Sequence, residues 1–411
     1  MRILYLMQYF VPPNGAWSTR SYEFARELIA RGHEVMVITS NGMLPDEYSN
    51  LKQTTRVDIS GVPCIVIPVP YATGMPFLQR VKGYLRFTSS AFKVIAQQPA
   101  DLVFASSSPL PIAIPGIWAK VRHRIPLVFE VRDLWPEMPI AIGALRSPLL
   151  KALARALEWL AYHASAHIIA LSPGMSDGVC QRGIPPQCVT IIPNFSDLAL
   201  FSQANQNGTS IRTRLDLKPN QPLIVYAGSF GLLNDVDYLV DVAHEMGNWL
   251  PDARFLVVGN GANKEKIVQR ASELGLLQRN LWIWDMIPKY QMPDLLASAT
   301  VATSLFVPLE PMWKNSANKF FDALAAGKPI AINYGGWQAE LIEETGAGIV
   351  MPPGDPKTGA RVLAEFLDDP ARLERASKAA RQLAERFSRD VAASRFVSVL
   401  EQVVSGRSET S

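Results

Sequence analysis

The segment from Lys314 to Pro329, KNSANKFFDALAAGKP, combines side chains that suit a phosphorylated sugar ligand. The pattern predicts a loop and then a short helix, whose N-terminus Asn315 or Ser316 could cap with a side-chain oxygen. Such an N-terminus carries partial positive charge and N–H donors, so it favours a phosphate group. Lys319 and Asp322 stand three residues apart and share one helix face. This face offers a cation for a diphosphate and a carboxylate for hydroxyls, which a sugar nucleotide requires together.

The end of this predicted helix is marked by Gly327, which suits a left-handed C-terminal position, and by Pro329, which prevents continuation. The alternative interpretation of the helix is an ordinary one. Lys319 and Asp322 could form a solvated ion pair on an alanine-rich core helix, because most surface pairs of this kind are weak.

Two glycine turns in the second half of the chain follow predicted strands, in YAGSFGLLN and VGNGANKEK. Glycine lets the backbone approach a ligand closely, although such turns are also common without one. Neither turn fits the dinucleotide fingerprint, and the ATP-binding P-loop pattern is absent. The candidate ligand-binding residues in these turns are Gly228, Ser229, Gly231 and Asn260.

Two polar loops stand out in the first half of the chain, each after an apolar strand pattern. The first contributes Asn14, Gly15, Ser18 and Arg20. The second, EVRDLWPE, contributes Arg132, Asp133, Trp135 and Glu137. The groups of the second loop are too polar for a core turn, so we expect them to bind an acceptor or to take part in catalysis. In the first loop, Gly15 is a candidate for donor binding, and the other three residues are candidates for acceptor binding. A buried structural pair of Arg132 with Asp133 is the alternative.

Composition bounds the class of protein. A chain of 411 residues with 48% hydrophobic and 19% charged residues is globular and long enough for two domains. Residues 1–198 carry 18 Lys+Arg against 13 Asp+Glu, whereas residues 199–411 carry 22 against 24. This excess is too small and dispersed for nucleic-acid binding. Three scattered cysteines and the lack of metal-ligand spacing predict no disulfide frame, no metal and no other cofactor.

Strand and helix patterns alternate along the chain, which predicts an α/β fold of two doubly wound parallel sheets. The segment from Asp197 to Pro222 lacks a strand pattern and marks the inter-domain crossing. We therefore expect an acceptor-binding domain at 1–198, a nucleotide-sugar domain at 199–385 and a C-terminal helix at 386–411 that packs back on the first domain. Pro370 to about Ser405 is helical by pattern.

The chain resembles the retaining glycosyltransferases of family 4, which have the GT-B architecture of two Rossmann-like domains facing a cleft. The resemblance covers nearly the whole length. It lies in QYFVPPNGAWSTRSYEFARELIARGHEVMVIT, EVRDLWPE, ALSPGMSDGV, IIPN, YAGSFG, NSANKFFDALAAGKPI and GAGIVMPPGDP. Within the family, the chain is most similar to bacterial transferases of O-antigen and exopolysaccharide assembly, of the L-fucosamine transferase kind.

The resemblance implies metal-independent transfer from a nucleotide sugar, usually UDP-linked, with retained anomeric configuration. Asp322 matches the second glutamate of the family's E-x7-E motif, which holds the ribose hydroxyls, and Lys314 replaces the first. The family's diphosphate-binding Arg and Lys are missing near Ser229 and Asn234. Lys319 is therefore expected to take over that role, with help from Lys314, the Gly231 backbone and the helix N-terminus. Asn318 is a further donor-binding candidate. Arg132 replaces a frequent histidine and could stabilise the departing diphosphate, whereas Asp133 could orient or deprotonate the acceptor.

The segment 77–93 predicts contact with a membrane, because residues 59–100 contain no acidic residue and this stretch interleaves basic with aromatic side chains. The alternative is a helix with its apolar side in the core. No transmembrane helix is predicted, and the first apolar run indicates a buried strand. We expect a cytoplasmic protein on the inner face of the cell membrane that acts on a polyprenyl-diphosphate-linked or glycan acceptor. A non-catalytic GT-B binding protein, a nucleotide-sugar epimerase and a phosphorylase remain alternatives.

Overall fold

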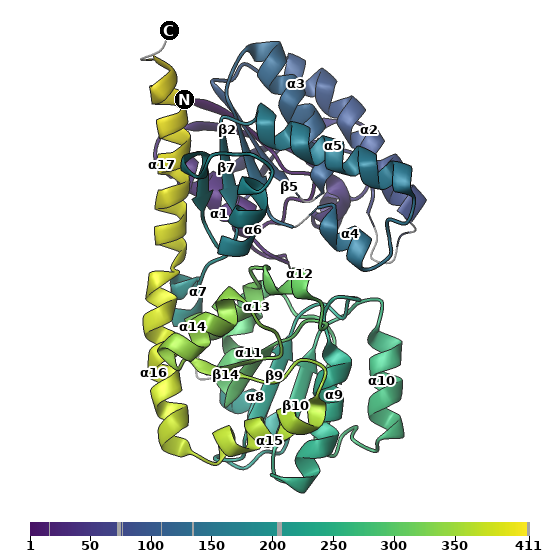
Figure 1. The fold of residues 1–411 in the computed structure, drawn as a ribbon, viewed down its shortest axis with the longest axis vertical. Coiled ribbons are helices and arrows are strands. Elements are labelled where there is room, and N and C mark those ends of the chain that lie inside the picture. The colour runs from purple at the N-terminus through teal and green to yellow at the C-terminus, as the bar shows by residue number, and fades with distance from the viewer. Residues whose placement is uncertain are drawn as a thin grey trace. The chain divides into compact units, whose positions relative to one another are not determined.

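The computed structural model describes residues 1–15, 17–71, 75, 77–107, 109–133, 135–203 and 208–408. The chain forms two compact units, which are described separately (Figure 1). Unit 1 comprises Met1–Pro193 and Asp390–Ser411, and unit 2 comprises Asn194–Arg389. The chain thus passes between the units at 193/194 and 389/390, where the sequence analysis placed the limits at 198/199 and 385/386.

The described residues of unit 1 build one eight-stranded sheet in the order β3-β4-β2-β1-β5-β6-β7-β8. Its pairs are parallel except for β3 with β4, which form a hairpin through Ser60 and Gly61, both with positive φ. The sequence analysis had no strand for β3, because TRVDI alternates polar and apolar residues and lacks the apolar run of the other strands. The strands are β1 (Arg2–Leu6), β2 (Glu34–Ser40), β3 (Thr55–Ile59), β4 (Val62–Ile67), β5 (Leu102–Ser107), β6 (Leu127–Val131), β7 (His167–Ala170) and β8 (Val189–Ile191).

Helices cover both faces of this sheet, and alternate residues of β1 show how. Leu4 and Leu6 belong to the core cluster formed with α2 and α3. Tyr5 points the other way and contacts Phe396, whose ring stacks on Phe24 at 4.3 Å. The C-terminal helix therefore belongs to the core of unit 1. The helices are α1 (Arg20–Ala30), α2 (Phe77–Ala96), α3 (Ala113–His123), α4 (Glu137–Ala141), α5 (Pro148–Ala164), α6 (Pro173–Cys180) and α17 (Arg389–Ser408).

The described residues of unit 2 build one six-stranded, fully parallel sheet in the order β11-β10-β9-β12-β13-β14. Its strands are β9 (Leu223–Ala227), β10 (Arg254–Val258), β11 (Leu281–Trp284), β12 (Val301–Ser304), β13 (Ile330–Ile332) and β14 (Gly348–Val350). Its helices are α7 (Leu198–Ser202), α8 (Gly208–Arg214), α9 (Val236–Glu245), α10 (Lys264–Glu273), α11 (Met292–Ser298), α12 (Glu310–Trp313), α13 (Asn318–Ala325), α14 (Trp337–Thr345), α15 (Pro356–Leu367) and α16 (Pro370–Arg386).

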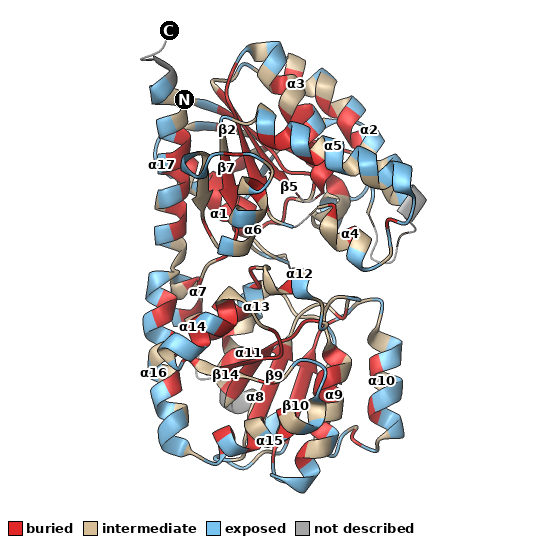
Figure 2. Ribbon diagram, viewed as in Figure 1, coloured by how far each residue is buried: buried red, intermediate tan, exposed pale blue. Residues whose placement is uncertain are grey.

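The buried side chains follow the layers of each unit (Figure 2). In unit 2, Tyr226, Phe255 and Val257 on the sheet pack with residues of α9, α10 and α15. The segment at 370–405 is two helices rather than one, with a break at Phe387 and Ser388. The prediction of an α/β protein with two doubly wound parallel sheets is confirmed.

Candidate functional site

The N-terminus of α13 in unit 2 has no side-chain cap. The helix begins at Asn318 after Ala317, so the predicted caps Asn315 and Ser316 are wrong. Asn315 instead accepts a hydrogen bond from the backbone N–H of Ser316, and the Ser316 hydroxyl accepts one from the backbone N–H of Asn194 at 3.0 Å. These bonds tie the preceding loop in place, and Ala317, at the cap position, offers no side-chain cap. The helix end keeps its partial positive charge for an anion.

Lys319 brings a cation to the same end of α13. Part of its surface stays exposed, but its ammonium group is surrounded by protein: Nζ donates to Asn234 Oδ1 at 2.9 Å and lies 5.3 Å from the ring centre of Tyr226. Burial lowers the pKa of Lys319 to about 8, an effect that the charge of Asp322 partly offsets. The ammonium donates its hydrogen bond to a neutral amide. An anion in addition to Asp322 would reduce the free-energy cost of burying the ammonium.

The glycines after β9 and β10 are required by close packing within unit 2. A Cβ atom on Gly228 would lie 2.1 Å from Cε of Lys319, so glycine makes room for this side chain. A Cβ on Gly259 would lie 1.9 Å from the carbonyl oxygen of Gly228. The two loops are joined by a hydrogen bond from the backbone N–H of Phe230 to the carbonyl of Asn260 at 2.9 Å. The predicted residues Gly228, Ser229, Gly231 and Asn260 are thus gathered at the carboxyl ends of β9 and β10.

Asp322 pairs with a residue that the sequence analysis did not consider. Its carboxylate accepts a hydrogen bond from Lys289, and both side chains are largely buried. The ordinary interpretation, an ion pair between Asp322 and Lys319, is therefore wrong, because the carboxylate pairs with Lys289. The separate roles expected for the two side chains, toward a diphosphate and toward hydroxyls, stay predictions. Lys314, at the C-terminal end of α12, and Asn318, which is exposed, lie on either side of the loop that precedes α13. Lys289 follows an edge strand, and its local sequence gives no sign of this contact.

A second polar group behind the α13 terminus was also missed. Burial raises the pKa of Asp235, just before α9, to about 6. Asn333, after β13, donates to Asp235 at 3.1 Å and accepts a bond from the backbone N–H of Phe306 at 2.9 Å. This amide joins the loops that follow β12 and β13 to the start of α9. It fixes the strand ends around Lys319, where ligands bind in doubly wound folds.

In unit 1, Arg20 is a buried structural residue, so its predicted contact with an acceptor is wrong. The guanidinium is 1% exposed and forms an ion pair with Glu130 at 2.9 Å. Two further bonds run to the backbone carbonyls of Pro193 and Ile192, at 2.6 and 2.8 Å. Ser106 donates to the other oxygen of Glu130 at 2.5 Å. All the charge of this pair is met by partners within the unit.

Arg132 follows β6 and keeps part of its side chain exposed. Its backbone N–H donates to Ser107 Oγ at 3.0 Å, and Nη1 donates to Ser21 Oγ at 3.4 Å. These bonds bring together the ends of β5 and β6 and the start of α1. Asp133 is exposed, which excludes the alternative of a buried Arg132–Asp133 pair. Both side chains are placed where a ligand could reach them.

Some of the remaining candidate site residues of unit 1 are exposed, and others already contact neighbouring side chains. Asn14 is exposed, and Gly15 and Ser18 are half-buried, within the loop after β1. Trp135 is half-buried and packs against the core of unit 1. Glu137 forms an ion pair with Arg182 at 2.6 Å, and Arg182 also binds the buried Glu158 at 3.1 Å. The carboxylate of Glu137 thus serves first to hold α4 to its neighbours, which weakens the prediction of an acceptor contact.

The predicted membrane segment 77–93 forms most of α2. Phe87 is fully buried, and Phe92 packs its ring against Trp118 at 5.2 Å. The side chain of Phe77 lies outside the described residues. Lys82, Arg86 and Lys93 are exposed. The described phenylalanines of this helix thus face the interior, so their expected contact with lipid is wrong, whereas the basic side is free to meet an anionic surface. Across the part of the chain that the structure describes, no helix has both the length and the apolar character needed to cross a membrane.

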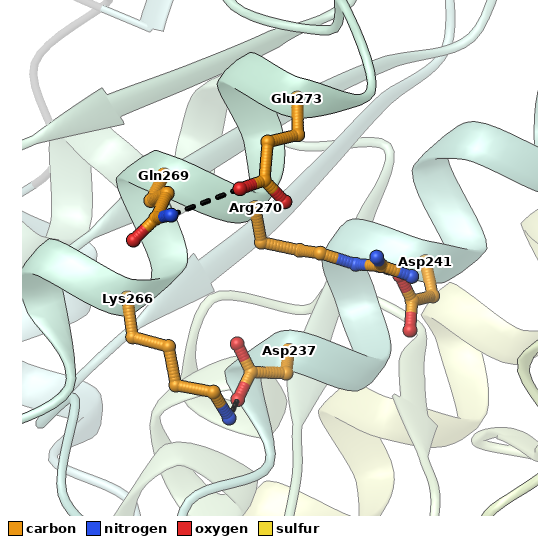
Figure 3. Close-up of a pocket in the computed structure, with 6 residues that line it drawn as sticks. All are labelled: Asp237, Asp241, Lys266, Gln269, Arg270 and Glu273. Carbon is orange, nitrogen blue, oxygen red and sulfur yellow. Dashed lines mark hydrogen bonds and ion pairs between the residues drawn. The ribbon is translucent and has the colours of Figure 1, made fainter.

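A separate surface hollow lies between α9 and α10 (Figure 3). Four of its five charged side chains pair with one another: Lys266 with Asp237 at 2.6 Å, and Arg270 with Asp241 at 2.9 Å. The fifth, Glu273, accepts a hydrogen bond from Gln269 at 2.9 Å. None of the predicted site residues lines it. Because both of its cations are already paired with carboxylates, we do not assign it to the candidate site.

A family model described as "Glycosyl transferase 4-like domain" matches residues 15–194, and one described as "Glycosyl transferases group 1" matches residues 208–383. A protein of Escherichia coli K12 named as a colanic acid biosynthesis glycosyl transferase, WcaI, is 25% identical over 67% of this chain and 69% of its own length. The D-inositol 3-phosphate glycosyltransferase of Xylanimonas cellulosilytica is 23% identical over 96% of this chain and 93% of its own.

Among solved structures, Anabaena Alr3699/HepE in complex with UDP and glucose superposes with a TM-score of 0.73. The two chains are 19% identical, and the match covers 98% of this chain and 100% of the other. This likeness concerns the fold. The two family matches span most of the sequence, and the two parallel-sheet units have the corresponding architecture. The chain therefore belongs to the family 4 glycosyltransferases, which have the GT-B fold.

Proposed function

We propose that the protein is a retaining, metal-independent glycosyltransferase. It takes a sugar, of the N-acetylated amino or deoxy kind, from a UDP-linked donor. The acceptor is a polyprenyl-diphosphate-linked or other glycan of surface polysaccharide biosynthesis at the inner face of the cell membrane. UDP is favoured as the nucleotide because the structurally similar HepE was solved with UDP. The polysaccharide context is favoured because the relative WcaI is named for colanic acid biosynthesis.

The observation that carries this proposal is the buried ammonium of Lys319 beside the uncapped terminus of α13. A diphosphate brings two or more negative charges, and charge-assisted hydrogen bonds from an ammonium and from backbone N–H groups suit it. Within the described residues, the ammonium of Lys319 donates its hydrogen bond to a neutral oxygen, Oδ1 of Asn234. An incoming diphosphate supplies countercharge beyond the partial offset by Asp322. We assign Lys319 to the diphosphate, with Lys314, Asn318 and the glycine loops around it.

Asp322 is assigned to the ribose hydroxyls. It lies one turn after Lys319 on α13, and its carboxylate can accept hydrogen bonds in addition to the one from Lys289. The hydrogen bond from Lys289 fixes the direction of the carboxylate. The two halves of a nucleoside diphosphate would thus be held by one helix.

On unit 1, the acceptor is assigned to the loops after β1 and β6. The acceptor hydroxyl attacks the anomeric carbon while the bond from that carbon to the diphosphate oxygen breaks. The hydroxyl proton passes to the departing diphosphate, with Asp133 orienting the hydroxyl and Arg132 stabilising negative charge. Attack and departure on the same face of the sugar retain its configuration. The protein contributes position and charge, which agrees with a site that presents no evident nucleophile.

The test is nucleotide release from UDP-, GDP- and ADP-sugars, with membrane extract as the source of acceptor. We expect release from one donor by the wild type, unchanged by a metal chelator, with an α-linked product from an α-linked donor. Asp322→Asn should raise the KM for the donor by roughly tenfold or more, because a charged hydrogen-bond partner is lost. If no donor sugar releases its nucleotide while the protein still binds UDP, a non-catalytic binding protein would be favoured.

Lys289→Met is the matched control for Asp322. It removes the same ion pair but keeps the carboxylate. If Asp322 binds ribose, the KM for the donor rises much more in Asp322→Asn than in Lys289→Met. Equal effects of the two variants would show that the ion pair acts only through the stability of α13, and the ribose assignment would be wrong.

A further inference from the structure

Helix α5 turns a mostly apolar face to solvent. Its inward side is formed by Ala161, Tyr162 and the buried Glu158. On its outward side, Leu149 is 68% exposed, Leu153 57% and Trp159 52%, and Leu150 and Leu160 are exposed too. Single exposed apolar residues are ordinary on protein surfaces. Five large ones on one helix of 17 residues form a patch of the kind that marks an interaction site.

The neighbouring helices continue this surface. Helix α3 packs against α2 on one side and α5 on the other, and exposed stretches run along all three (Figure 2). On α3, Ile114 and Val121 are seven residues apart, so they share one helix face, and Val121 is 69% exposed. On α2, Leu85 is exposed between Lys82 and Arg86. We call the exposed residues of α2, α3 and α5 the outer helical face.

The charge of the outer helical face has a single sign. The sequences of α2, α3 and α5 contain one acidic residue, Glu158, which is buried and paired with Arg182. Basic side chains lie around the apolar patch. Those that are exposed include Lys82, Arg86, Lys93, Arg122 and Arg155. The outer helical face thus has an apolar centre, basic flanks and no exposed carboxylate on its helices. It is complementary to a layer with an apolar interior and an anionic surface.

We propose that the outer helical face, with α5 at its centre, docks the protein on an anionic lipid bilayer. The leucines of α5 would enter the boundary of the acyl chains. Trp159, an amphipathic aromatic residue, would sit at headgroup depth, with the basic residues against the lipid phosphates. A second copy of the chain fits less well, because symmetric pairing would set Arg155 and its basic neighbours against one another without carboxylates between them.

The docking gives the protein access to a lipid-linked acceptor, and only this purpose rests on the proposed function. It also assigns the membrane contact differently from the sequence analysis. The phenylalanines of α2 are turned inward, so α2 supplies charge, whereas the apolar insertion comes from α5.

The experiment is co-sedimentation of the full chain with vesicles of phosphatidylcholine alone or mixed with phosphatidylglycerol. We expect the wild type to bind the mixed vesicles preferentially. Leu153→Gln with Trp159→Gln should weaken that binding by about tenfold or more, since two apolar side chains are removed from the boundary. Arg155→Glu should weaken it by about fivefold or more, because each basic residue near such a surface contributes a factor of this size.

The matched control is Leu232→Gln with Trp249→Gln in unit 2, which replaces side chains of similar exposure, 66% and 48%. This variant should bind vesicles like the wild type. Circular dichroism and thermal unfolding establish that all variants are folded, as expected for exposed positions. Transfer to a detergent-dispersed acceptor should be unchanged in Leu153→Gln with Trp159→Gln, and transfer on vesicles should fall.

Equal vesicle binding by the α5 variant and the wild type would overturn the proposal, as would a wild type that stays in the supernatant with both vesicles. A wild-type dimer that becomes monomeric in the α5 variant, without lipid binding, would assign the face to a second copy instead. Vesicle binding is measured without substrate. A wild type that binds vesicles but transfers no sugar would therefore refute the proposed function and leave the docking intact.

Discussion

The two units treat a buried cation in opposite ways. In unit 1, the guanidinium of Arg20 meets the carboxylate of Glu130 and two backbone carbonyls. In unit 2, the ammonium of Lys319 meets the amide oxygen of Asn234 and the faces of two aromatic rings. Burial of a charge costs free energy unless a partner compensates it. Arg20 has its compensation in the fold, whereas Lys319 would obtain it from a ligand.

This contrast separates structure from function better than residue type does. Both residues were candidates from the sequence, and both lie in loops or helix starts at strand ends. The compensated cation should be needed for folding and the uncompensated one for binding. The variants below test that division.

The largest effect is expected at Glu130. Glu130→Gln leaves the Arg20 guanidinium buried without its countercharge, so the free energy of unfolding should fall by about 3 to 5 kcal/mol. Urea denaturation followed by tryptophan fluorescence measures it. If the free energy of unfolding falls by less than about 1 kcal/mol, as for an exposed ion pair, Arg20 does not depend on Glu130 for its compensation.

Lys319→Met should have the opposite character. The free energy of unfolding should stay the same or rise, because a poorly compensated buried charge is replaced by an apolar chain. Affinity for UDP should fall by roughly 10- to 100-fold, the value of hydrogen bonds to a charged group. Calorimetric titration with UDP, together with thermal unfolding, measures both.

Lys328 is the matched control for Lys319. It lies just beyond the other end of α13, its pKa is also lowered by burial to about 8, and it donates to the carbonyl of Ala297 at 2.9 Å. Lys328→Met should leave the affinity for UDP unchanged. If both variants lose affinity equally, the effect comes from the packing of α13 and not from a bound diphosphate.

Gly228→Ala sharpens the comparison with a smaller change. The added Cβ would meet Cε of Lys319 at 2.1 Å and displace this side chain from Asn234. Overpacking of this kind costs about 1 to 3 kcal/mol. We expect a lower melting temperature and weaker UDP binding together. Gly247→Ala, where the added Cβ meets nothing within 4 Å, is the control and should change neither. Wild-type affinity for UDP in Gly228→Ala would contradict the placement of Lys319 in the donor site.

Some features of the fold were predictable from the local sequence. Apolar runs between helix patterns predicted the parallel sheets, since strands buried on both faces have no polar alternation. Gly327 takes the predicted left-handed conformation, with φ of 62°, at the end of α13. Local rules suffice for such features, because their causes lie within a few residues.

Partners far apart in the chain were not predictable in the same way. Glu130 stands 110 residues from Arg20, and Lys289 stands 33 residues from Asp322. Nothing in the local pattern tells a loop arginine that binds a ligand from one that pairs with a buried glutamate. Helix α5 is a related case: apolar residues occur on both of its sides, so periodicity cannot say which side the sheet covers.

The smallest effect concerns pH and follows from the lowered pKa of Lys319, about 8. The free protein holds Lys319 charged below this value and neutral above it, and a bound diphosphate favours the charged form. UDP affinity should therefore decline as the pH rises through 8, by about fivefold between pH 8 and 9. The phosphates of UDP are already ionised in that range, and Lys319→Met should remove the decline. If the affinity of Lys319→Met for UDP also declines with pH, the decline comes from another titrating group. The ammonium of Lys319 would then not be the group that binds the diphosphate.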